Sequence, residues 1–268
     1  MLFYVKRLFK RKKKMREGTK IICDVLGAMS SAGLSIAANN DTSSFIAASS
    51  APIISTGLNS LINGVFKEDS SEREFERLGI SAKAVKNSYE RNLKQGKTIV
   101  NSIFINSEIK GPNINDVLES ILQSIKDDSE TMKSEIYGRF LGNIPFRGDL
   151  DASNILFIKN IIHSLSFTEL CILEIINRRN IPKLSNLQQM INSDNRPVLF
   201  EFYNALLKLK SNSLLLARGP VSLGDTIGNV EISKLGKYVC DVAELNQINA
   251  DWLATTESIL ISISKSSV

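Results

Sequence analysis

The sequence contains one histidine, His163, and three widely spaced cysteines among its 268 residues. Hydrolases and metal enzymes generally need a cluster of nucleophiles, bases or ligands, which this inventory does not supply. The cysteines Cys23, Cys171 and Cys240 form neither a disulfide framework nor the paired spacing of a zinc site. We therefore expect no catalytic residues, no metal and no cofactor, and a reducing, cytoplasmic environment.

Charge is almost absent from Val25 to Phe66, where Asp41 is the one charged residue. The arms 20–38 and 42–66 each approach the roughly 20 residues that span a bilayer as helix. However, Ser, Thr and Asn recur in both arms, and Pro52 would kink a helix. Many small residues would allow helices to approach closely. Three interpretations stay open: a weak membrane hairpin, a buried hairpin of a soluble core, and a segment that converts between the two.

The apolar residues of this hairpin are the candidates for membrane contact. They are Leu26, Leu34, Ile36, Phe45, Ile46, Ile53, Ile54, Leu58, Leu61, Ile62 and Phe66. The stretch has no clear apolar core followed by a small-residue cleavage site, so we do not expect a cleaved signal peptide. Conditional insertion is preferred to a permanent anchor because of the polar residues.

Basic residues gather at the N-terminus. Eight of the 33 basic residues lie in the first 16 positions, which leaves 25 basic against 28 acidic groups in the rest of the chain. Aromatic and aliphatic residues between the charges are typical of an interfacial helix, and each basic residue near an anionic surface contributes roughly 1 kcal/mol. A disordered, solvated tail is the alternative. The predicted lipid- or phosphate-binding residues are Lys6, Arg7, Lys10, Arg11, Lys12, Lys13, Lys14 and Arg16.

The pattern after residue 67 is mainly helical. Ser71 and Glu74 form a capping box before apolar positions at helical spacing over 75–93. The pattern predicts further helices at 117–125, 132–140 and 155–165. The helix at 132–140 stops at Gly142 and Pro145, and Asp149 or Asp151 caps the helix at 155–165. A second capping box, Ser166 with Glu169, opens a helix over 170–176. Short connections of this kind are typical of a helical bundle.

The last hundred residues change in character. After the helix at 170–176 we predict helices at 185–193 and 197–210, strands at 214–218 and 229–233, and a helix from 234. Three helices, a hairpin and a further helix are the order of a winged helix, with 219–228 as the wing. A DNA-reading helix presents basic and amide groups. The helix 197–210 offers Glu201, Asn204, Lys208 and Lys210 but is dominated by apolar residues. This composition favours burial or protein contact over DNA.

Together these patterns predict a mainly α fold. A helical bundle is followed by a winged-helix-like C-terminal domain and preceded by a basic segment and a weakly hydrophobic helical hairpin. The predicted divisions are 1–19 for the polybasic segment, 20–66 for the hairpin, 67–150 for the helical domain and 151–268 for the winged-helix-like domain.

The remaining polar motifs receive structural interpretations. Asp127 and Asp128 lie at a helix end and are interpreted as caps and solvated surface, not as an acid/base pair. His163 lies in an apolar helix, so we expect a packed or partly exposed structural histidine. Gly96-Lys97-Thr98 lacks the strand and the first glycine of a phosphate loop.

Four segments carry a resemblance to a known family. They are Ser71-Glu72-Arg73-Glu74, the helix of residues 134–143, the run Leu165-Ser166-Phe167-Thr168-Glu169 with its apolar continuation, and Ile232-Ser233-Lys234-Leu235-Gly236. Over roughly residues 70–242 the chain resembles the abortive-infection alpha (Abi-alpha-like) family of phage-defence-associated bacterial proteins. The resemblance implies a role in growth arrest or death of the infected cell, with no catalytic residue to carry over.

Joined to the N-terminal region, the resemblance implies an effector at the cytoplasmic face of the inner membrane with its body in the cytoplasm. The expected partners are anionic phospholipid, a sensor or activating protein, and a second copy of the chain packed through the small-residue hairpin. When the partner signals, the N-terminal region would perturb the membrane. The alternative is a soluble winged-helix adaptor or nucleic-acid-binding protein with a basic N-terminal arm.

Overall fold

The structure, a computed structural model, describes residues 20–22, 60–67, 69–100, 114–178, 196–218 and 229–265. Helix accounts for 77% of the described residues, and the one sheet among them has two strands. The prediction of a mainly α protein is therefore confirmed. The chain divides into two compact units, residues 1–163 and 164–268. The four-part division predicted from the sequence stays a prediction.

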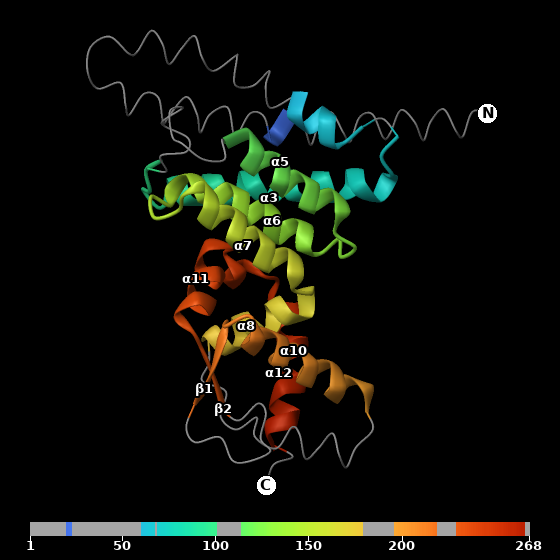
Figure 1. Ribbon diagram of the computed structural model, residues 1–268, viewed down its shortest axis with the longest axis vertical. Helices are drawn as coiled ribbons and strands as arrows, with labels where there is room; N and C mark the ends of the chain where they lie inside the picture. Colours follow the sequence, from blue (N-terminus) through green and yellow to red (C-terminus); the bar gives the residue numbers. More distant parts are fainter. Residues whose placement is uncertain are drawn as a thin grey trace, which may run out of the picture. The chain divides into compact units, whose positions relative to one another are not determined.

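The first unit is built from helices. They are α3 (Glu72–Lys94), α5 (Ile114–Asp127), α6 (Lys133–Asn143), the short 3-10 helix η1 (Ile144–Phe146) and α7 (Ala152–Ser164). Figure 1 shows the long helix α3 beside α5 and α6, and contacts join all three pairs. The helices predicted at 75–93, 117–125, 132–140 and 155–165 correspond to α3, α5, α6 and α7.

Helices α3 and α7 begin at capping residues that the sequence predicts. The Ser71 hydroxyl accepts from the Glu74 amide at 3.2 Å, and the Glu74 carboxylate accepts in return from the Ser71 amide. Of the two candidate caps for α7, Asp151 is the one in place, since its carboxylate accepts from the Asn154 amide at 2.7 Å. Such contacts satisfy amides that have no partner within the helix.

Two glycines on one face of α6 bring it close to α3. A β-carbon on Gly138 would lie 2.4 Å from the carbonyl oxygen of Ser81, and one on Gly142 would lie 2.6 Å from that of Val85. Contacts this short are not tolerated, so only glycine permits the observed approach. The hydroxyl of Ser81 uses the short separation to donate to the Ser134 carbonyl at 2.7 Å. Gly142 is therefore a packing residue, and α6 ends one residue later at Asn143, between the predicted stops Gly142 and Pro145.

The second unit surrounds one buried helix. Its elements are α8 (Phe167–Arg178), α10 (Pro197–Ser211), β1 (Leu215–Arg218), β2 (Asn229–Ile232), α11 (Lys234–Val242), η2 (Leu245–Gln247) and α12 (Ala250–Lys265). Every residue of α8 from Glu169 to Ile176 is buried. Contacts reach α8 from α10, α11, α12, η2 and β2. A helix covered on all sides in this way is the core of its unit.

The strands form an antiparallel pair in which Leu215 lies opposite Ile232 and Arg218 opposite Asn229. Ser233 then starts α11, because its hydroxyl accepts from the Gly236 amide at 2.8 Å. Both strands and both flanking helices lie where the sequence predicts. The predicted helix at 185–193 and the predicted wing at 219–228 lie outside the described residues.

Candidate functional site

The basic N-terminal residues predicted to bind lipid or phosphate lie outside the described part of the chain. Of the predicted hairpin residues, Leu61, Ile62 and Phe66 are described. Ile62 and Phe66 have no exposed surface, while Leu61 is partly covered. Lys126 of α5 donates to the Val65 carbonyl at 2.9 Å. The end of the predicted hairpin is thus attached to the first helical unit.

No single helix among the described residues combines the length and the apolar character needed to cross a membrane. One bent pair, α7 followed by α8, meets that requirement by length and composition.

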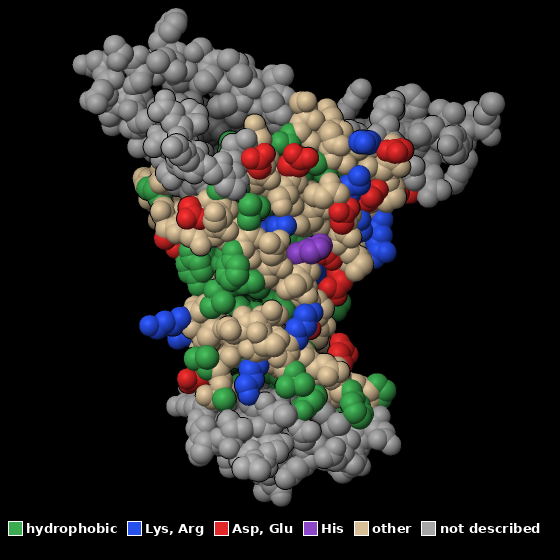
Figure 2. Space-filling view, in the orientation of Figure 1, with side chains coloured by type: hydrophobic (Ala, Val, Ile, Leu, Met, Phe, Trp, Pro, Cys, Tyr) green, Lys and Arg blue, Asp and Glu red, His purple; other side chains and the backbone are tan. Residues whose placement is uncertain are grey.

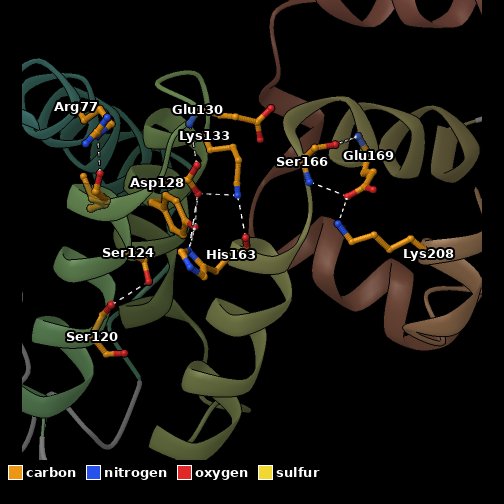
Figure 3. Close-up of polar contacts among 12 residues, drawn as sticks. Arg77, Ser120, Ser124, Asp128, Glu130, Lys133, His163, Ser166, Glu169 and Lys208 are labelled. Atoms are coloured by element: carbon orange, nitrogen blue, oxygen red, sulfur yellow. Dashed lines mark hydrogen bonds and ion pairs between the residues drawn. The ribbon is translucent and has the colours of Figure 1, made fainter. Parts of the chain in front are cut away.

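The most concentrated group of polar side chains in the described residues surrounds Asp128, which follows α5 directly. Arg77 of α3 fixes the end of α5, because its guanidinium donates to the Ile125 carbonyl at 3.0 Å and also to the carbonyl of Lys126 (Figure 3). Asp128 then turns the chain toward α6, since its carboxylate accepts from the Glu130 amide at 2.9 Å. The start of this loop is thereby held against α3.

The Asp128 carboxylate is buried and doubly engaged. The Lys133 ammonium lies 2.6 Å from its Oδ2 atom, and the Tyr137 hydroxyl donates to the same atom at 2.9 Å. Lys133 and Tyr137 stand one turn apart on α6 and so share a face. All three side chains are at most 5% exposed. The interpretation of Asp128 as solvated surface is therefore wrong; its neighbour Asp127 is exposed, as predicted.

His163 joins this group from the end of α7. Its Nδ1 atom lies 3.1 Å from the Tyr137 hydroxyl and 3.8 Å from the Asp128 carboxylate. Its backbone carbonyl accepts from the Lys133 ammonium at 3.1 Å, which places a cation at the C-terminal end of a helix. The imidazole is 47% exposed and visible at the surface (Figure 2, purple). We refer to Asp128, Lys133, Tyr137 and His163 as the Asp128 cluster.

The surroundings of Tyr137 keep its hydroxyl protonated within the Asp128 cluster. Burial, together with the charge of Asp128 and the hydrogen bond to it, raises the pKa of Tyr137, so the phenol stays protonated. Its single proton is donated to Asp128. The 3.1 Å contact between Tyr137 and His163 is then made by a proton on Nδ1 of the imidazole.

An open groove of about 470 Å³ lies between α5 and α7, and His163 forms part of its wall. The α5 side is formed by Asp116, Glu119, Ser120, Gln123, Ser124 and Asp127, and the α7 side by Lys159 and His163. Burial lowers the pKa of Lys159. The groove is polar and carries more carboxylates than cations.

Sequence reasoning missed the Asp128 cluster and the groove. The one available signal is the placement of Lys133 and Tyr137 four residues apart at the start of a helix that follows Asp128. Nothing in that spacing indicates burial, because Lys and Asp at helix ends are usually solvated. The acidic face of α5 could be predicted from its spacing, whereas Lys159, which lines the same groove, comes from another helix.

Buried acids in the second unit are also paired. Glu169 accepts from the Lys208 ammonium at 2.8 Å and from the Ser166 amide at 2.7 Å (Figure 3). Lys208, one of the polar residues that the helix 197–210 offers, is thus engaged within its own unit. The described residues contain no group of three or more His, Cys, Asp or Glu side chains arranged to hold a metal ion.

Cys240 provides a test of this core. Burial raises the pKa of its thiol, and the neighbouring Glu174 carboxylate raises it further. Because the thiolate is the reactive form, we expect alkylation of Cys240 by iodoacetamide at pH 8 to be roughly a hundredfold slower than in urea. Peptide mapping by mass spectrometry measures both rates. Equal rates in the native and denatured chain would contradict the buried position.

Comparisons with known proteins give no relative. No protein-family model matches the chain, and no curated protein and no solved structure matches it significantly.

Proposed function

We propose that the chain is a non-catalytic, membrane-associated effector whose basic N-terminal segment binds anionic phospholipid at the cytoplasmic face of the inner membrane. The observation that carries the proposal is the separation of charge: eight basic residues lie within the first 16, whereas the remaining chain has 25 basic and 28 acidic groups. Attraction to a phosphate-rich surface must therefore come from the N-terminus. Stable membrane binding generally requires two or more membrane-binding features. The basic N-terminal segment is one such feature, and the apolar stretch 20–66 is the second.

The pairing of the buried carboxylates after residue 66 is consistent with a non-catalytic role for this part of the chain. The Asp128 carboxylate is matched by Lys133 and Tyr137, and Glu169 by Lys208. Glu174 lies 2.6 Å from the Arg178 guanidinium. Pairing compensates the cost of burying these ions, which is what a structural role requires.

The proposed trigger is a protein partner. Together with the helix predicted at 185–193, the elements α8, α10, β1, β2 and α11 would follow the order of a winged helix, and we propose this fold for the second unit. On α10, the exposed side chains include Phe200, Glu201 and Asn204, while Lys208 is engaged by Glu169. Such a face suits a protein better than a phosphate backbone. The resemblance to the abortive-infection alpha family suggests that the signal is phage infection and that the response is perturbation of the membrane.

Vesicle binding of the full chain tests the proposal. Replacing Lys10, Lys12, Lys13 and Lys14 by Gln removes four charges at about 1 kcal/mol each, so partitioning onto phosphatidylglycerol-containing vesicles is expected to fall by two to three orders of magnitude. Co-sedimentation measures the partition coefficient, and dye release from the same vesicles measures perturbation. Added salt should weaken binding of the unmodified chain.

The matched control replaces four exposed lysines of the body, Lys83, Lys94, Lys234 and Lys237, by Gln. This variant has the same net charge as the N-terminal variant and should bind vesicles nearly as well as the unmodified chain. An equal loss in both variants, or equal binding to vesicles of zwitterionic lipid alone, would contradict a local membrane-binding segment.

The second candidate function is a winged-helix adaptor or nucleic-acid-binding protein with a basic arm. The element order of the second unit is the observation that favours it. Duplex DNA at low salt separates the two functions, because neutralising about eight phosphate contacts would give a steep dependence of affinity on salt. Salt-sensitive DNA binding without vesicle binding would favour this second function.

A further inference from the structure

We draw no further inference here: the strongest candidate, the outer face of α12 with its exposed residues Trp252, Ala254, Ser258 and Ser262, carries none because nothing in the structure shows what covers it.

Discussion

Replacing Gly138 by alanine is expected to lower the free energy of unfolding by about 2–3 kcal/mol. In a free helix the same change would be stabilising by about 1 kcal/mol, since alanine is the better helix former. Here a β-carbon would meet the Ser81 carbonyl at 2.4 Å and the Ala84 side chain at 2.7 Å. The backbone of α3 cannot yield as a flexible side chain would, so α6 has to move away. Urea denaturation followed by circular dichroism measures the change.

Gly79→Ala is the control for this substitution. Gly79 also lies within a helix, but nothing lies within 4 Å of its added β-carbon. We therefore expect a gain of about 0.5–1 kcal/mol from helix propensity alone. The two glycine substitutions should thus differ in sign. A stabilising effect at Gly138 would show that α3 and α6 are not in close contact.

Lys133→Met is expected to cost about 3–5 kcal/mol, because it leaves the Asp128 carboxylate buried without its counter-ion. Because methionine occupies a similar volume, the packing changes little. The lost stability therefore measures the effect of removing the positive charge. Lys133 also donates to the His163 carbonyl, and that acceptor loses its partner in the same variant. Chemical denaturation of the full chain, followed by circular dichroism of its helices, measures the effect.

A second substitution separates the charge from the packing. Adding Asp128→Asn to Lys133→Met removes the unpaired charge while keeping an acceptor for the Glu130 amide, and should recover about half of the lost stability. The control Lys86→Met breaks an exposed pair with Glu90, 3.8 Å apart, and should change stability by about 0.5 kcal/mol or less. A double variant no more stable than Lys133→Met would mean that the ion pair is not the source of the loss.

Local chemistry explains which parts of this fold were predictable. Ser166 and Glu169 cap α8 as predicted, with the Glu169 amide donating to the Ser166 hydroxyl at 3.2 Å, because a capping box depends on residues three positions apart. The same holds for Ser71 and Asp151. Strands at 215–218 and 229–232 were likewise predictable from short apolar runs around a loop.

Features that depend on a partner helix were not predictable. Gly142 lies at a helix end as predicted, since α6 ends at Asn143, but its packing against Val85 and Ser88 depends on α3 and has no signal in the local sequence. Asp128 gave the signal of a solvated cap, and its burial depends on Lys133 and Tyr137 together with the end of α7. Both features have one physical cause, since spacing along a chain does not reveal which faces of different helices meet.

The complete burial of α8 also limits how this protein can change over evolutionary time. Every residue from Glu169 to Ile176 is buried and several elements of the unit pack against the helix, so few substitutions here would leave the packing unchanged. A replacement in this helix would need a compensating one in α10, α11, α12 or β2. Divergent relatives should therefore retain the volume and polarity of this octapeptide while their outer helices vary, which makes it the most durable marker by which such relatives can be recognised.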